Sequence, residues 1–141
     1  MWEAIGGRLR AHLARADPVY RRWARREMRA RRFFGFLVEA ADGRPAGSGA
    51  LWLVPTQPRP GRLARNDRLP YVMSMYTEPE FRGRGVATRI LRAQLRWATA
   101  HGYGRISLHA SPMGRPVYER LGFVATNEMR RELPRARRGR R

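Results

Sequence analysis

The sequence predicts an α/β (α+β) fold in which a mixed, mostly antiparallel sheet is flanked by helices. Apolar residues make up 43% of the 141 residues, enough for the core of one domain. Two apolar segments flank the turn signal Asp42-Gly43, which predicts a β-hairpin. A strand, a long amphipathic helix and another strand then follow one another, a pattern typical of a strand–helix–strand unit in a mixed sheet.

The composition excludes several classes of protein. All 30 basic residues are arginine, against 11 acidic residues, for a net charge of +19. The chain has no cysteine, which excludes disulfides and thiol catalysis, and its three histidines lie in different parts of the chain, so we expect no metal site. No apolar run approaches the roughly 20 residues that span a bilayer, and the start lacks the apolar centre of a secretion signal. We therefore expect a cytoplasmic protein without membrane contact.

The first third of the chain reads as helical. Trp2, Ile5, Leu9 and Leu13 recur near a 3.6-residue period, which predicts a helix over residues 2–15. Asp17-Pro18 has the pattern of a helix start, with Asp17 as the N-cap and Pro18 at the first helical position. A second helix is therefore expected over residues 18–32.

The remaining elements are predicted from apolar runs and from the glycine and proline residues that mark turns and the ends of helices and strands. Ser111-Pro112 again resembles an N-cap followed by a first-position proline, and Gly122 marks the end of that short helix. In chain order we expect strands over 33–41 and 46–54, a loop over 55–69, a strand over 70–77, a helix over 84–101, a strand over 105–109, a helix over 112–122 and a last strand within 123–133. One domain over residues 1–133 and a disordered arginine-rich tail over 134–141 complete the prediction.

The segment from Tyr76 to Thr88 is the most informative for function. It joins a strand to a long helix and places small residues at the turn and in the first helical turn. Small residues allow a ligand to approach the backbone, and the first amides of a helix are unpaired donors at the positive end of its dipole. Such a site binds phosphate or pyrophosphate. The glycine spacing alone fits an ordinary strand–helix turn equally well.

Two motifs in this part of the chain carry a resemblance to a known family. Arg82-Gly83-Arg84-Gly85-Val86-Ala87 matches the pattern Gln/Arg-x-x-Gly-x-Gly/Ala, and Val117-Tyr118-Glu119-Arg120-Leu121-Gly122-Phe123 matches a tyrosine-bearing helix that ends in Leu-Gly-Phe. The chain thus resembles the GNAT superfamily of acyl-CoA-dependent N-acyltransferases. The resemblance covers roughly residues 33–133.

The resemblance implies an N-acetyltransferase that moves an acetyl group from acetyl-CoA to a primary amine by direct attack in a ternary complex. Tyr118 would be the general acid that protonates the leaving thiolate, although it could also be a packing residue only. The strand over 70–77 would splay from its neighbour and offer backbone groups to the pantetheine arm. The cofactor-binding residues implied are Met75, Tyr76, Thr77, Arg82, Gly83, Arg84, Gly85, Val86, Ala87, Thr88 and Ser111.

The sequence departs from the family pattern at three points. A helix is predicted where the family chain opens with a strand, so that strand is either missing or dispensable. Ser111 stands where many members have asparagine, which weakens a contact to pantetheine carried over from the family. The strand over 70–77 contains no carboxylate to act as the general base. Glu78, His109, Asp67 and an ordered water chain all stay candidates for that role.

The acceptor amine stays open, as does a homodimeric state. Tyr20, Trp23 and the loop over 55–69 are expected to border the acceptor entrance. One rival interpretation is a basic nucleic-acid-binding protein that uses the arginines of residues 18–32 and the tail, but the chain has no recognised nucleic-acid motif. The other rival is a non-catalytic acyl-CoA sensor of the same fold. We therefore expect acetyl-CoA and an amine, rather than nucleic acid, as partners.

Overall fold

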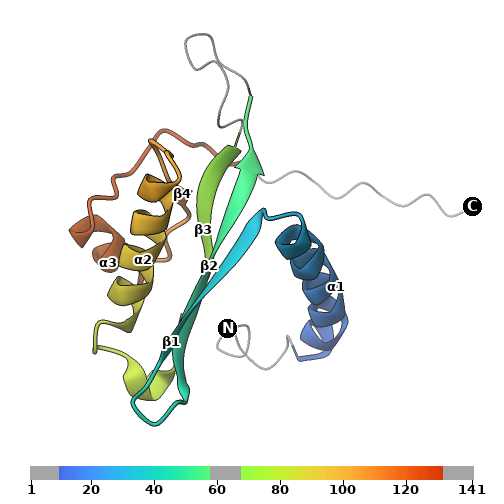
Figure 1. The fold of residues 1–141 in the computed structure, drawn as a ribbon, viewed down its shortest axis with the longest axis vertical. Helices are drawn as coiled ribbons and strands as arrows, with labels where there is room; N and C mark the ends of the chain where they lie inside the picture. The colour runs from blue at the N-terminus through green and yellow to red at the C-terminus, as the bar shows by residue number, and fades with distance from the viewer. Residues whose placement is uncertain (1–9, 58–67, 132–141) are drawn as a thin grey trace, which may run out of the picture.

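The computed structural model describes residues 10–57 and 68–131. In that part a sheet separates two helical layers, with α1 on one side and α2 and α3 on the other (Figure 1). The elements in chain order are α1 (Arg10–Arg29), β1 (Phe33–Glu39), β2 (Pro45–Pro55), β3 (Arg68–Thr77), the 3₁₀ helix η3 (Pro79–Phe81), α2 (Val86–Ala100), β4 (Ser107–Leu108) and α3 (Arg115–Arg120).

The sheet confirms the predicted mixed, mostly antiparallel arrangement. Its strand order is β1-β2-β3-β4, with antiparallel pairing from β1 to β3 and parallel pairing between β3 and β4. The predicted hairpin turn lies between β1 and β2, where the Ala40 amide donates to the Arg44 carbonyl. Gly43 adopts φ +79° in this turn, a conformation that favours glycine. Local turn chemistry therefore sets the register of the first two strands.

The predicted break between two N-terminal helices is wrong. A single helix, α1, runs from Arg10 to Arg29 with Pro18 inside it. Asp17 does not cap a new helix but forms an ion pair with Arg21, at 2.7 Å. Proline has the helical φ value, but inside a helix it removes one hydrogen bond and its ring crowds the carbonyl four residues earlier, so it weakens or kinks a helix without always ending it. The helix ends before Arg31, which has φ +54°.

Three predictions for the C-terminal third need correction. The strand expected over 105–109 is only the two-residue β4, and α3 begins at Arg115 with Gly114 as its N-cap, not at Pro112. No strand occurs within 123–131, where Val124 and Met129 are 80% and 95% exposed and have no sheet face to cover. The expectations for residues 2–9, for the loop over 58–67 with Asp67, and for the tail over 134–141 fall outside the described residues.

The core lies between the sheet and α2. One cluster joins Leu51, Val72 and Leu91, and a second joins Ala46, Val86 and Ile90. The buried positions of α2 recur every three or four residues, as expected for one face of a helix. This face fixes the start of α2 against the ends of β2 and β3.

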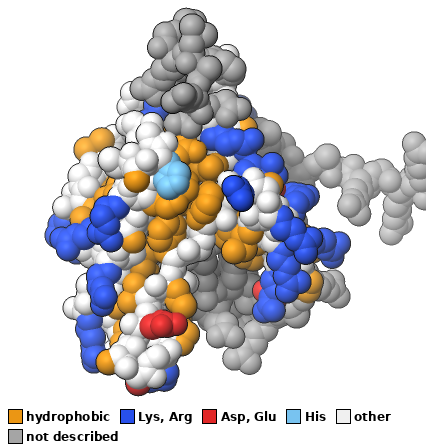
Figure 2. Space-filling view, viewed as in Figure 1, with side chains coloured by type: hydrophobic (Ala, Val, Ile, Leu, Met, Phe, Trp, Pro, Cys, Tyr) orange, Lys and Arg blue, Asp and Glu red, His pale blue; other side chains and the backbone are white. Residues whose placement is uncertain are grey.

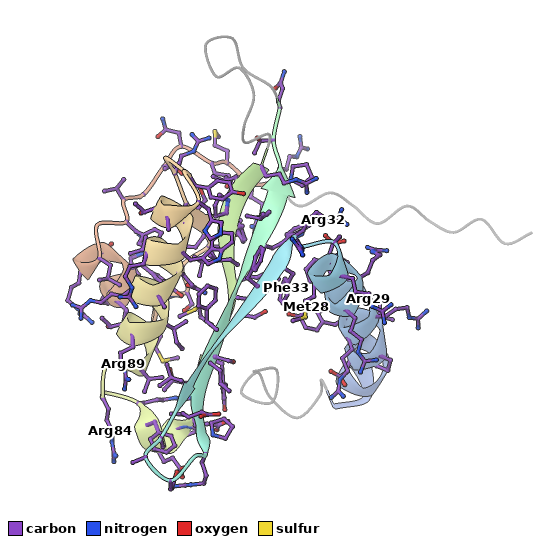
Figure 3. The ribbon with its side chains drawn as sticks, in the orientation of Figure 1. Met28, Arg29, Arg32, Phe33, Arg84 and Arg89 are labelled. Atoms are coloured by element: carbon purple, nitrogen blue, oxygen red, sulfur yellow. The ribbon has the colours of Figure 1, made fainter. Side chains whose placement is uncertain are left out.

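Aromatic packing and a buried ion pair attach α1 to the other face of the sheet. The Trp23 ring meets Phe33 and Trp52 edge-on, at centroid distances of 5.4 and 5.2 Å. Glu27 is 6% exposed and accepts two hydrogen bonds from Arg32, at 2.7 and 2.9 Å, and one from the Trp52 indole at 3.3 Å. Arg32 lies at the junction of α1 and β1 (Figure 3). Its hydrogen bonds outweigh the cost of burial and lower the pKa of Glu27 to about 2.

Removing the charge of Glu27 should destabilise the fold in a pH-dependent way. Glu27→Gln should lower the free energy of unfolding at pH 7 by roughly 1–3 kcal/mol, because charge-assisted bonds to Arg32 are lost. Because the pKa is lowered, ionised Glu27 contributes its full stabilisation above the ordinary pKa of 4.5, and this contribution is lost as the pH falls towards about 2. The difference in free energy of unfolding between wild type and variant, measured by urea denaturation, should therefore become smaller between pH 4.5 and about pH 2. The exposed Glu119→Gln is the control, and an equal effect of both variants would contradict the assignment.

Candidate functional site

Strand β3 loses its neighbour β4 halfway along its length. The two strands pair only at Tyr71↔Ser107 and Val72↔Leu108. From Met73 to Thr77, β3 continues with β2 as its only strand partner among the described residues. This loss of pairing is what the predicted splay requires, and we call the region of Met73–Thr77 and the chain after Leu108 the β3–β4 opening.

A β-bulge lies at the start of the β3–β4 opening. Ser48 pairs with Tyr76 and Ala50 with Met73, so that Ser74 and Met75 of β3 both lie opposite Gly49. Ser74 has φ +56°, which is uncommon for a residue other than glycine. Its hydroxyl lies 3.0 Å from the Tyr20 hydroxyl of α1. The structure thus brings Tyr20 to the opening, and the Trp23 ring lies behind it, 5.7 Å from the Tyr20 ring, packed on β1 and β2.

Two glycines of β2 allow α2 to lie close to the bulge. A Cβ atom at Gly49 would collide with the Met75 sulfur and would come within 2.8 Å of Ile90 Cγ2. A Cβ atom at Gly47 would lie 2.6 Å from Val86 Cγ1 and 2.7 Å from the Tyr76 carbonyl. Sequence reasoning missed this role, although glycine inside a strand is the signal for a close backbone approach.

The glycine-containing turn leads from β3 into α2 and is open to solvent. Gly83 and Gly85 have φ +72° and +76°, and a Cβ atom at either would meet nothing within 4 Å. Gly85 is the N-cap of α2, and no side chain caps this helix start. The first-turn amides of Val86, Ala87 and Thr88 therefore lie at an uncapped, positive helix end that can accept an anion.

Both arginines and carboxylates lie near this turn, and Arg84 keeps its charge unpaired in the described part of the chain. The guanidinium groups of Arg44 and Arg84 lie over the Phe81 ring, at 5.5 and 5.9 Å. Arg44 is neutralised by Asp42 and Glu80, at 2.7 and 2.6 Å, whereas Arg84 has no carboxylate partner in the described part of the chain. Figure 3 shows Arg84 and Arg89 near the start of α2. Figure 2 shows further arginine side chains gathered over α1.

Arg82 uses its side chain inside the turn. Its Nε atom donates to the Thr77 carbonyl, at 3.2 Å. Thr77 is one of the positions at which the family resemblance implies a backbone contact to pantetheine. A ligand that binds this carbonyl would have to share it with Arg82 or displace the guanidinium.

Tyr118 of α3 packs on the same side of the sheet as α2. Its ring contacts the cluster of Leu51, Val72 and Leu91 and meets Phe123 at a centroid distance of 5.9 Å. Gly114 makes room for the ring, since a Cβ atom there would lie 2.9 Å from Tyr118 Cε2. The Tyr118 hydroxyl has no hydrogen-bond partner among the described residues, and burial raises its pKa. The ring therefore packs while the hydroxyl stays available and protonated.

The other predicted site residues are distributed as follows. The Ser111 hydroxyl accepts the Gly114 amide at 3.1 Å, within the turn before α3. Glu78 accepts the Tyr76 hydroxyl at 3.3 Å and lies near Arg44 and Pro45, on the rim of an open hollow of about 430 Å³. His109 follows β4 directly and lies where β4 leaves β3.

Comparison with protein families identifies this arrangement. The model described as "Acetyltransferase (GNAT) family" matches residues 7–123. The chain belongs to the GNAT family of acetyltransferases. The first GNAT motif, Arg82–Ala87, forms the open turn after β3 and the first residues of α2, and the second, Val117–Phe123, carries Tyr118.

Several solved structures share the GNAT fold. A predicted acetyltransferase from Clostridium acetobutylicum, solved with acetyl-CoA, is 28% identical, with a TM-score of 0.70 over 79% of this chain and 71% of that one. A GCN5-related N-acetyltransferase from Ralstonia eutropha JMP134 is 25% identical, with a TM-score of 0.75 over 87% and 79%. An acetyltransferase from Trypanosoma brucei is 26% identical, with a TM-score of 0.60 over 76% and 74%. No curated protein matches the chain.

No helix among residues 10–57 and 68–131 is long and apolar enough to cross a bilayer. Within the same ranges, no group of three or more histidine, aspartate or glutamate side chains is arranged to hold a metal ion.

The close approach of α2 to β2 can be tested with two glycine substitutions. Gly47→Ala should lower the free energy of unfolding by roughly 1–3 kcal/mol, because its methyl group meets Val86 and the Tyr76 carbonyl. Gly35→Ala on β1 is the matched control, since a Cβ atom there meets nothing within 4 Å, and its effect should stay within about 0.5 kcal/mol. Thermal and urea denaturation measure both. A Gly47→Ala protein as stable as the control would show that α2 does not depend on this contact.

Proposed function

We propose that the protein is an N-acetyltransferase that transfers an acetyl group from acetyl-CoA to a primary amine within a ternary complex. The observation that carries this proposal is the β3–β4 opening, which leads to the uncapped start of α2. The Tyr118 hydroxyl, which has no hydrogen-bond partner among the described residues, adds a proton donor on the α2 side of the sheet. The Clostridium acetobutylicum relative, which was solved with acetyl-CoA, supports the choice of donor.

The turn before α2 would hold the pyrophosphate of acetyl-CoA. Amides from Gly83 to Thr88 would supply donors, whereas the Arg82 amide already donates to the Pro79 carbonyl at 3.3 Å. The open space around Gly83 and Gly85 admits phosphate oxygens. Arg84 adds a positive charge that no carboxylate of the described residues neutralises. The pantetheine arm would then run along the free edge of β3, beside Met75 and Thr77, with Ser111 on the facing turn.

The reaction would be a direct attack of the neutral amine on the thioester carbonyl carbon. A tetrahedral oxyanion forms, and a backbone amide of β3 near Met75 or Tyr76 would stabilise it. When the C–S bond breaks, the Tyr118 hydroxyl gives its proton to the departing thiolate, and the attacking nitrogen releases its extra proton to solvent, so that a neutral amide forms. Solvent then returns a proton to the phenol. Because burial raises the pKa of Tyr118, the phenol carries this proton throughout the neutral range.

An available phenol favours an enzyme over an acyl-CoA sensor. Packing holds the Tyr118 ring against Leu51, Val72 and Leu91, while its hydroxyl has no hydrogen-bond partner in the described part of the chain and keeps some contact with solvent. A sensor needs only the packed ring, whereas a general acid needs a hydroxyl that stays protonated and can reach a ligand. Burial raises the pKa of Tyr118, which keeps the proton on the oxygen.

Acetyl-CoA should raise the melting temperature of the wild type by mass action, and Gly85→Glu should remove this shift. The new side chain would place bulk and a negative charge where the pyrophosphate binds. Gly102→Glu is a matched control at the other end of α2, because Gly102 has the same φ of +76° and a Cβ atom there also meets nothing within 4 Å. Differential scanning fluorimetry measures both. If the folded Gly85→Glu protein showed the same rise in melting temperature with acetyl-CoA as the wild type, the assigned site would be refuted.

Tyr118→Phe deletes only the hydroxyl. If Tyr118 is the general acid, turnover should fall by roughly 10²–10⁴-fold, while the thermal shift with acetyl-CoA stays near that of the wild type. The rate of thiol release with an excess of amine measures turnover. The control is Tyr103→Phe, which should keep full activity. Tyr103 follows α2, and its ring stacks on the ring of Trp97. Unchanged turnover in Tyr118→Phe would leave Tyr118 as a packing residue.

A further inference from the structure

His109 is the first residue beyond the point where β4 leaves β3. The last paired positions are Val72 and Leu108, so the His109 backbone stands at the start of the β3–β4 opening. Ile106 and Leu108 pack into the cluster with Leu91, on the side of α2. Side chains alternate along a strand, so those of Ser107 and His109 are on the other side of the sheet, where the His109 side chain is 55% exposed.

The two faces of the opening therefore carry different chemistry. Tyr118 lies on the face of α2, within the cluster around Leu91. Tyr20 of α1 reaches Ser74 on the opposite face, at the bulge. Tyr71 belongs to that opposite face too, because its hydroxyl contacts His109 Nδ1 and its neighbour Val72 packs on the α2 side. An acyl group held in the opening would have a phenol on each side.

His109 is held between three polar groups. Nδ1 contacts the Tyr71 hydroxyl, and Nε2 lies 3.0 Å from Glu128 Oε1 and 3.3 Å from Arg130 Nη2. A carboxylate only accepts and a guanidinium only donates, so Nε2 can serve only one of them at a time. With the proton on Nε2 bound to Glu128, Nδ1 is the basic nitrogen and accepts from the Tyr71 hydroxyl. When both ring nitrogens carry a proton, Nδ1 donates to the Tyr71 oxygen and Nε2 donates to Glu128.

We propose that Tyr71 and His109 form the proton relay that deprotonates the acceptor amine, on the face of the sheet opposite Tyr118. This inference rests on the proposed function and selects one of the candidates for its general base. Tyr71 is the catalytic residue, because its oxygen receives the substrate proton. His109 is a positioning residue that acts through Tyr71, with Glu128 behind it.

The relay is balanced in protons. One N–H bond of the substrate ammonium breaks, and its proton passes to the Tyr71 oxygen as the Tyr71 proton passes to His109 Nδ1. The amine is left neutral with a free electron pair, and the imidazolium that forms is paired with Glu128. His109 and Glu128 have side chains 55% and 67% exposed, so solvent can take the proton back after each turnover.

The other base candidates are less well placed. Glu78 follows Thr77, at the other end of the β3–β4 opening, and already accepts a hydrogen bond from Tyr76. It lies with Arg44 and Glu80 on the rim near the β1–β2 hairpin, not where β3 and β4 part. Asp67 falls outside the described residues. Among the candidates that the structure describes, His109 is the one that lies at the start of the opening, and its contact with Tyr71 extends towards β3.

The test compares two acceptors with wild type and His109→Gln. An alkylamine has a pKa of about 10, so it needs a base at pH 7, whereas an arylamine is already neutral there. His109→Gln should lower kcat/KM for the alkylamine at pH 7 by roughly 10- to 100-fold, and the loss should shrink as pH approaches about 10. The same variant should leave kcat/KM for the arylamine and the thermal shift with acetyl-CoA almost unchanged.

Two further variants complete the experiment. Tyr71→Phe keeps the ring and should reproduce the loss seen in His109→Gln with the alkylamine. His101→Gln is the matched control, because His101 is also exposed but binds the Trp97 carbonyl at the end of α2, and it should behave as wild type. Because Arg130 also touches His109, all variants are compared at one fixed ionic strength.

The outcomes separate the relay from the proposed function. The relay would be overturned if His109→Gln lowered kcat/KM equally for both amines, or if its kcat/KM for the alkylamine equalled that of His101→Gln. Either result would leave the proposed acetyl transfer standing. A wild type that transfers acetyl to neither amine would overturn the proposed function and the relay with it.

Discussion

The separation of β3 from β4 after Val72 is the constraint on which the site depends. Backbone amides and carbonyls inside a sheet need partners, and an interrupted ladder leaves a row of them without a neighbouring strand. In the described part of the chain, β3 still pairs with β2 along its other edge, so the opening persists without unravelling the strand. A ligand that lies along this edge would gain hydrogen bonds that the fold itself does not use.

The rest of the structure holds the opening in place from both faces. On one face, Gly47 and Gly49 allow α2 to press against the bulge, which fixes the uncapped helix start at the end of β3. On the other face, the Glu27–Arg32 pair anchors α1, and Tyr20 reaches the Ser74 hydroxyl at the bulge. Ser74 keeps an uncommon backbone conformation, and such strain is typical of functional sites that the surrounding packing over-determines.

The sequence was informative where local chemistry decides the structure. The Asp42-Gly43 turn, the amphipathic α2 and the glycine turn before it follow from short-range patterns, and all three are present. The bulge at Ser74 could not be predicted, because a serine in a strand gives no local sign of positive φ. The continuous α1 was missed because Pro18 is equally compatible with the first turn of a helix and, at a cost, with its interior. The contact between Tyr71 and His109 joins residues 38 positions apart, which only the pairing of β3 with β4 brings together.

Hydrogen–deuterium exchange with and without acetyl-CoA tests the central claim most directly. If the donor lies along β3 and at the start of α2, it should protect the amides of residues 73–77 and 83–88, because these gain hydrogen bonds or lose contact with water. The amides of α1, on the other face of the sheet, should exchange at unchanged rates. The account would be contradicted if acetyl-CoA protected only the amides of α1, the arginine-rich helix. It would also be contradicted if a saturating concentration of acetyl-CoA left the turn before α2 unprotected.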